Sequence, residues 1–147
     1  MVTIKQATKS ELKDIVPLFT AYRLFYGQDQ EEATALAFLK ERLEKKESII
    51  FVAYKNSNPV GFTQLYPTFS SVSLKASLIL NDLYVSEDNR NTGIAKALLQ
   101  EAKTYCRDKN YKGLALETAT NNPAQYLYEK AGWKKDVHVF HYFWAAN

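Results

Sequence analysis

The hydrophobic residues of this sequence recur at two spacings that alternate along the chain, and this alternation restricts the fold more than any other feature. Segments with the two-residue period of strands take turns with segments that have the 3.6-residue period of helices. Elements in such an order pack as layers, with helices covering a sheet. The sequence therefore predicts an α/β, or mixed α+β, fold.

Local signals set the expected bounds of these segments. Thr8-Lys9-Ser10-Glu11 has the form of a capping box and predicts the start of a helix that ends at Gly27. Another helix is expected from Asp29 to Lys46, and Asn122-Pro123 predicts the start of a short helix that Gly132 ends, because proline favours a first turn. The expected strands are 2–6, 49–54, 60–66 (ended by Pro67), 77–85, 113–118, 133–136 and 139–144.

Length and composition fit one ordinary globular domain. The chain has 147 residues without a linker or an internal repeat, so a single domain spanning residues 1–147 is expected. No apolar run approaches the roughly 20 residues that cross a bilayer, and the first residues do not form a signal peptide. The lone cysteine, Cys106, cannot form an internal disulfide. We therefore expect a cytoplasmic protein with no membrane partner.

The charge pattern argues against a nucleic-acid partner. The formal net charge is +3, and the longest charged tract, residues 40–47, alternates in sign as a solvated helix face does. Nucleic-acid binders instead concentrate basic residues on one face or in one tract. No nucleic acid is therefore expected to bind, although basic groups that face a polyanionic cofactor agree with this composition.

A polar loop between Val85 and Ala95 joins a strand to a helix and has the character of a phosphate site. Gly93 lets the backbone approach a ligand closely, and the free N–H groups of a helix N-terminus attract phosphate. The motif G-x-G-x-x-G is absent, which disfavours a Rossmann site, and G-x-x-x-x-G-K-S/T is absent, which disfavours a P-loop. On the loop alone, an ordinary strand-to-helix turn is an equal alternative.

Two motifs at their expected separation identify a family. Arg90-x-x-Gly93-x-Ala95, preceded by Asn81-Asp82-Leu83-Tyr84-Val85, resembles the acetyl-CoA signature Gln/Arg-x-x-Gly-x-Gly/Ala of the GNAT superfamily of N-acetyltransferases. Further on, the family has an Asn, a short helix with a Tyr, and Gly before an aromatic residue, and residues 121–133 supply these in order. The resemblance implies a three-layer fold with a central mixed, mostly antiparallel sheet flanked by helices.

The same resemblance implies an activity. An N-acetyltransferase of this type transfers the acetyl group of acetyl-CoA directly to a primary amine of a polyamine-like or amino-acid-like small molecule, or of a protein. Tyr22-Arg23-Leu24-Phe25-Tyr26 further resembles a subgroup that acetylates polyamines, small amines or protein amino groups. The alternative is a catalytically weak acyl-CoA sensor or interaction module, because Asn81 stands where many members carry Glu.

The family's cofactor contacts map onto one stretch of this chain and one distant residue. The strand residues would pair with the pantetheine arm, the loop amides would bind the pyrophosphate, and Asn121 would contact acetyl-CoA or act as a turn residue. No metal is expected, since His138 and His141 would face opposite ways on a strand. The expected cofactor-binding residues are Leu83, Tyr84, Val85, Arg90, Asn91, Thr92, Gly93, Ile94, Ala95, Lys96 and Asn121.

Two residues are candidates for proton transfer. Tyr128 matches the Tyr that protonates the departing CoA thiolate in the family, and its alternative role is a core aromatic. Asp82 is a base acting through water, a clamp for a cationic substrate, or a structural hydrogen-bond acceptor, and these three readings stay open. Strand alternation would point Asn81 and Asp82 to opposite faces, unless a bulge re-aims one of them.

Aromatic residues near the end of the first helix are candidates for substrate binding. Tyr22, Phe25 and Tyr26, with the acids of the segment Asp29–Glu32, could form a pocket for a cationic amine. The alternative places the rings in the helix core and uses the acids as a favourable start of the second helix. The aromatic segment 139–144 could supply an interface strand for a homodimer.

Overall fold

The computed structural model describes residues 1–146 and has the predicted alternation of strands and helices. The chain forms two compact units, one of residues 1–117 and one that begins at Thr118, and each is described by itself. A single domain over the whole chain stays a prediction. None of the helices in the described residues combines the length and apolar character that crossing a bilayer requires.

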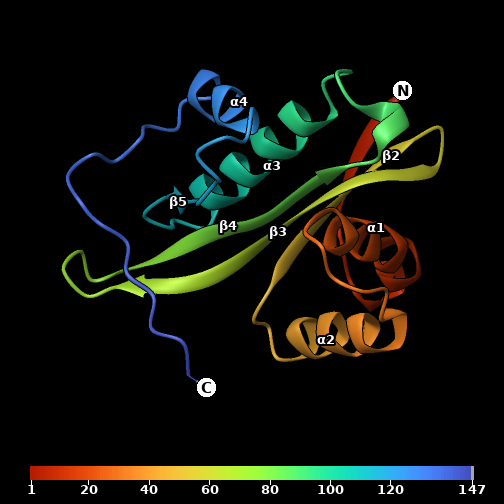
Figure 1. Ribbon diagram of the computed structural model, residues 1–147, viewed down its shortest axis with the longest axis horizontal. Coiled ribbons are helices and arrows are strands. Elements are labelled where there is room, and N and C mark those ends of the chain that lie inside the picture. The colour runs from red at the N-terminus through yellow and green to blue at the C-terminus, as the bar shows by residue number, and fades with distance from the viewer. Residues whose placement is uncertain (147) are drawn as a thin grey trace. The chain divides into compact units, whose positions relative to one another are not determined.

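The first unit holds a sheet and three α-helices (Figure 1). Its strands are β1 (Val2–Gln6), β2 (Ile49–Lys55), β3 (Asn58–Ser70), β4 (Lys75–Val85) and β5 (Leu114–Ala115). Its helices are α1 (Leu12–Phe25), α2 (Glu32–Glu44) and α3 (Ile94–Asp108), with short 3-10 turns η1 (Lys9–Glu11) and η2 (Glu87–Asn89).

The five strands lie in the order β1-β2-β3-β4-β5, and only the β4–β5 pair is parallel. The prediction of a mixed, mostly antiparallel sheet is therefore confirmed. Strand β3 continues past Pro67, where the sequence predicted its end, and Pro67 pairs with Leu78. Because β2 begins opposite Leu65, β3 has a neighbour on one side only beyond that residue, and an edge tolerates a missing N–H.

Helices cover both faces of this sheet, which gives the predicted three layers (Figure 1). Ile50 and Val52 of β2 join the buried cluster formed with α1 and α2, in which Leu39 is fully buried. Phe51 lies between them in the sequence and points to the opposite face, where its ring meets Tyr105 of α3 at a centroid distance of 5.7 Å. The sheet is therefore buried on both sides in its middle.

The predicted capping box begins the first helical segment. The Thr8 hydroxyl accepts a hydrogen bond from the Ser10 amide at 3.2 Å, and the Thr8 amide donates to Glu11 Oε1 at 2.7 Å. The first turn is the 3-10 turn η1, and α1 follows it directly. Gly27, the predicted stop, lies just after α1 with φ +80°. The box fixes how the chain leaves β1 and thereby how α1 lies on the sheet.

The second unit contains one short helix, α4 (Ala124–Lys130), after which Gly132 has φ +105°. The predicted strands at 133–136 and 139–144 do not form, and β5 covers only two residues of the predicted strand 113–118. The segment 139–144 has large aromatic or apolar side chains on both sides of His141 rather than a regular alternation with polar residues, so it does not select one buried face. Its side chains are exposed, with Phe140 at 87%.

Candidate functional site

The loop after β4 leads into α3 through two residues in the left-handed region. Asn91 has φ +61°, and Gly93, at the N-cap of α3, has φ +87°. A Cβ atom built on Gly93 would meet no atom within 4 Å, so the glycine is required by backbone conformation rather than by space. No acidic side chain lies in the first turn of α3. This helix start is therefore suited to an anion.

Side chains of the loop are engaged in bracing the loop itself. The Arg90 Nε donates to the Val85 carbonyl oxygen at 2.9 Å, and its guanidinium carbon lies 5.5 Å from the ring centroid of Tyr84. The Thr92 hydroxyl donates to the Asn89 carbonyl at 2.5 Å. These bonds favour the expectation that the loop offers a ligand mainly backbone groups.

Strands β4 and β5 meet over a short length only. Leu78 and Ile79 pair with Leu114 and Ala115, and β4 then continues to Val85 with no described strand on that side. The residues Leu83 to Val85, predicted to contact an extended arm, therefore have no described strand on that side, although the Val85 carbonyl oxygen already accepts from Arg90. Such an edge can accept an extended ligand as an additional strand.

A β-bulge interrupts the pairing of β3 with β4. Gln64 lies opposite Asp82 and Leu65 lies opposite Leu80, so Asn81 is the extra residue of β4. Asn81 is exposed, whereas Asp82 is buried with 3% of its surface exposed. Even so, Asn81 Nδ2 donates to Asp82 Oδ1 at 3.0 Å. The bulge brings the two side chains together, which regular alternation would not allow.

Polar groups from three elements surround the Asp82 carboxyl. Gln64 Nε2 of β3 donates to Asp82 Oδ2, and the Tyr22 hydroxyl of α1 also bonds to this carboxyl. Burial raises the pKa of Asp82, and the hydrogen bonds from Gln64, Tyr22 and Asn81 oppose this rise. Burial and the nearby Asp82 also raise the pKa of the Tyr66 phenol. The site thus holds one buried carboxyl among neutral donors.

The predicted substrate aromatics lie together at the end of α1. The ring centroids of Tyr22 and Tyr26 are 5.0 Å apart, and those of Phe25 and Tyr26 are 5.2 Å apart. Tyr22 is half-buried and packs on Phe62, whereas Phe25 and Tyr26 are 66% and 56% exposed. Phe25 and Tyr26 are therefore not helix core, and Tyr22 links the aromatic cluster to Asp82.

The acidic residues after α1 are partly engaged. Arg23 pairs with Glu31 through an Nη2–Oε2 distance of 3.2 Å and donates from Nη1 to the Asp29 carbonyl oxygen at 3.1 Å. Glu32 lies in the first turn of α2, where a negative charge interacts favourably with the helix dipole. These contacts agree with the alternative that assigns the acids to the start of the second helix.

Two predicted residues belong to the second unit. Tyr128 is half-buried in α4, and its ring meets Trp133 edge-on at a centroid distance of 6.2 Å. Asn121 is exposed, and the cap-like bond at the start of α4 comes from its neighbour, because Asn122 Oδ1 accepts from the Ala124 amide at 2.9 Å. The roles predicted for Tyr128 and Asn121 stay predictions.

Sequence reasoning missed Gln64, Ser48 and Tyr66, which take part in or lie near the Asp82 cluster. Gln64 is fully buried, and its Oε1 accepts a 2.7 Å hydrogen bond from the buried Ser48 hydroxyl. The available signal was a glutamine between apolar residues of an expected strand, since such a side chain must find hydrogen-bond partners when it is buried. Its partners could not be named without the strand register.

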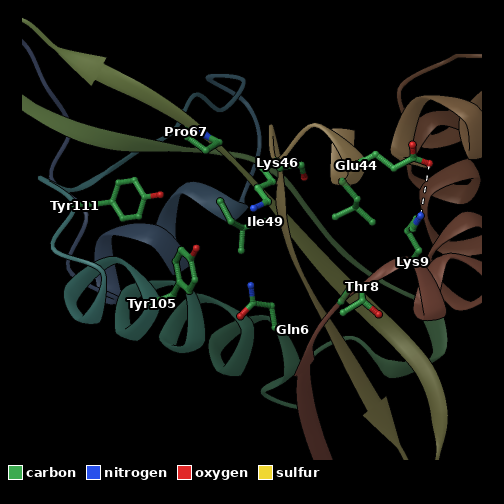
Figure 2. Close-up of a pocket in the computed structure, with 12 residues that line it drawn as sticks. Gln6, Thr8, Lys9, Glu44, Lys46, Ile49, Pro67, Tyr105 and Tyr111 are labelled. Atoms are coloured by element: carbon green, nitrogen blue, oxygen red, sulfur yellow. Dashed lines mark ion pairs between the residues drawn. The ribbon is translucent and has the colours of Figure 1, made fainter. Parts of the chain in front are cut away.

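A separate pocket of about 760 Å³ opens near the start of β2 (Figure 2). Tyr105 and Tyr111 lie on one side of it, and the ion pair of Lys9 with Glu44 lies on the other. None of the site residues predicted from the sequence lines this pocket. Within residues 1–146, no group of three or more His, Cys, Asp or Glu side chains is arranged to hold a metal ion.

Comparisons with known proteins agree with this arrangement. A family model described as the acetyltransferase (GNAT) family matches residues 12–133. The uncharacterized N-acetyltransferase YhfO of Bacillus subtilis is 46% identical over 142 residues, which cover 96% of this chain and 95% of that protein. A probable acetyltransferase of Haemophilus influenzae is 35% identical over 88% of each chain. The crystal structure of a probable acetyltransferase has a TM-score of 0.94 at 39% identity, over 99% of this chain and 98% of that one.

Proposed function

Because this chain belongs to the acetyltransferase (GNAT) family, we propose that it transfers the acetyl group of acetyl-CoA to a primary amine that binds beside Asp82. Acetyl-CoA is the family's co-substrate and supplies the acetyl group as a reactive thioester. The acceptor is a polyamine-like or amino-acid-like small molecule, or a protein amino group. A cytoplasmic location and a homodimer through residues 139–144 stay predictions.

The features around α3 support acetyl-CoA binding. The helix start at Gly93 offers backbone N–H groups and no competing acid, which suits a pyrophosphate. The β4 edge at Leu83 to Val85 offers hydrogen-bonding groups to the pantetheine arm, and an N–H of this stretch would polarise the thioester carbonyl. Arg90 remains near the strand end as a positive charge.

The observation that carries the proposal is the buried carboxyl of Asp82 at the β4 bulge. An amine attacks a thioester only in its neutral form, so an ammonium substrate must first lose a proton. In this proposal Asp82 accepts that proton directly or through water, and its raised pKa, which is closer to neutral pH than that of an exposed aspartate, supports the role. Tyr22 bonds to the same carboxyl, and the exposed rings of Phe25 and Tyr26 in its cluster are available to a cation.

The reaction then needs a proton for the sulfur that departs. The new bond joins the amine nitrogen to the acetyl carbon, the carbon–sulfur bond breaks, and the thiolate takes a proton. We assign this proton to the Tyr128 hydroxyl, which matches the family's donor. The ammonium gives one proton to Asp82 before the attack, and the nitrogen gives a second proton to water as the amide forms. Water then returns a proton to the Tyr128 oxygen, so Asp82 acts as the proton acceptor and Tyr128 as the proton donor.

A thiol-release assay tests this function. Purified protein with acetyl-CoA is given a panel of polyamines, amino acids and lysine peptides, and free CoA thiol is measured for each. We expect release with a primary amine that carries positive charge. Tight acetyl-CoA binding by calorimetry, with no release across the panel, would instead support the acyl-CoA sensor that Asn81 in place of Glu suggests.

A further inference from the structure

Two buried side chains behind Asp82 connect it to the start of β2. Gln64 has no exposed surface, and Ser48 has 7% of its surface exposed. The Ser48 hydroxyl donates to Gln64 Oε1 at 2.7 Å, and Gln64 Nε2 donates to Asp82 Oδ2. Ser48 thus donates to Gln64, and Gln64 in turn donates to the Asp82 carboxylate, which only accepts.

Ser48 supports the orientation in which the donor end of the Gln64 amide faces Asp82. A glutamine amide has a donor end and an acceptor end, and rotation by half a turn would exchange them. The Asp82 carboxylate only accepts and so takes the NH2 group, and the Ser48 hydroxyl donates to Oε1 at the other end, so the two bonds together favour one orientation of the amide. A donor aimed at a carboxylate stabilises its charged form, whereas a carbonyl oxygen in the same place would repel it.

We propose that Gln64, oriented by Ser48, is a positioning residue that holds the Asp82 carboxylate in the orientation and charge state needed to take a proton from the amine. This inference rests on the proposed function. Gln64 occupies Oδ2 from the buried side, which leaves Oδ1 on the side of the exposed Asn81. The remaining acceptor capacity of Oδ1 therefore lies on the side of the exposed Asn81, where an amine could reach it.

The hydrogen bond from Gln64 is important because opposing effects act on the pKa of Asp82. Burial favours the neutral acid, and the donors on it favour the carboxylate, with Gln64 acting more strongly than Tyr22 or Asn81. The titratable groups that face this carboxyl are Tyr22 from α1 and Tyr66 from β3, and Arg42 of α2 acts on Tyr66. In the described part of the chain no cation bonds to Asp82, so none replaces the effect of Gln64 when it is removed.

Four variants separate positioning from general stability. Gln64→Leu keeps the approximate size and removes the donor, and Ser48→Ala releases the amide. Ser48→Thr retains the hydroxyl and serves as the conservative rescue. Thr63→Val is the matched control, because the Thr63 hydroxyl is equally buried and bonds to the same residue at 2.8 Å, but to the backbone oxygen of Asp82 rather than its carboxyl.

The measurement is the titration of the Asp82 carboxyl carbon by ¹³C NMR in protein labelled at aspartate, with the resonance assigned by its loss in Asp82→Asn. We expect the pKa of Asp82 to rise by about one pH unit in Gln64→Leu and by less in Ser48→Ala. Ser48→Thr and Thr63→Val should titrate as the wild type does. The acid limb of kcat/KM with an active amine should shift by the same amount as the NMR titration.

An Asp82 titration that is unchanged in Gln64→Leu would overturn the inference. Should Gln64→Leu not fold, the Ser48→Ala and Ser48→Thr pair decides in its place, and equal titrations in that pair would overturn it too. The NMR titration needs no substrate, so it is independent of turnover. A shifted titration in a protein without transferase activity would support the Gln64–Asp82 relation and defeat the proposed function alone.

Discussion

Asn81 and Asp82 are consecutive residues of β4, yet Asn81 Nδ2 donates a 3.0 Å hydrogen bond to Asp82 Oδ1. Consecutive residues of a regular strand point to opposite faces and cannot meet in this way. The bulge at Asn81 removes that constraint and turns one exposed and one buried side chain toward each other. The bulge therefore sets the geometry of the carboxyl to which we assign proton acceptance.

Asp82→Asn should lower kcat/KM by about 10²–10⁴-fold, because an amide cannot accept the proton of the amine. In the wild type, kcat/KM should fall on the acid side through a pKa above that of an ordinary aspartate, since burial raises the pKa of Asp82. Asp108→Asn, at the exposed end of α3, is the control and should leave the profile unchanged. An Asp82→Asn enzyme with a wild-type profile would contradict the base assignment.

Tyr128→Phe should lower kcat by about 10²–10⁴-fold and leave the affinity for acetyl-CoA unchanged, because only the proton donor is lost. The matched control is Tyr126→Phe, which removes a hydroxyl from the same helix at a residue that is 68% exposed. Steady-state rates and calorimetric binding measure the two effects separately. Equal rates for the two variants would leave Tyr128 with a packing role against Trp133.

Features that depend on neighbouring residues could be predicted from the sequence. The capping box of Thr8 and Glu11 spans four residues, and its bonds form within that stretch. The loop that ends at Gly93 is also local, since one residue with positive φ defines the start of α3. The family motifs around this loop then supplied the expected sheet, which the structure confirms.

Features that depend on pairing between distant residues could not be predicted. The partners of Gln64 follow from the register of β3 with both β2 and β4, and a shift by one residue would turn its side chain to the other face. The sequence left three roles of Asp82 open, because the bulge that orients its side chain depends on how β3 pairs with β4. The prediction of a strand at 139–144 was wrong, because apolar character alone does not provide a pairing partner.

Gly93→Ala should weaken acetyl-CoA binding and lower the melting temperature by about 2–8 °C, because a side chain at φ +87° costs about 1–2 kcal/mol. Gly113→Ala is the matched control, since a Cβ atom there also meets open space but its φ lies outside the left-handed region. Calorimetric titration and thermal unfolding of both variants test this. Equal losses in the two variants would contradict a conformational requirement at Gly93.

Glu11→Gln should lower the melting temperature by about 2–4 °C at pH 7, as expected for about 1 kcal/mol of lost capping. The Thr8 amide and the Lys5 ammonium hold the pKa of Glu11 below its usual 4.5, so the charged form is the stabilising one.

This stability is fully present above pH 4.5 and is lost as the pH falls through the folded-state pKa. A protonated Glu11 resembles glutamine, so the difference between wild type and variant should disappear once the pH lies below the folded-state pKa of Glu11. Glu41→Gln, whose carboxylate is exposed and pairs with Lys45 at 2.7 Å, is the control and should show almost no difference at either pH. A gap for Glu11→Gln that persists at low pH would mean that the charge of Glu11 does not stabilise the fold.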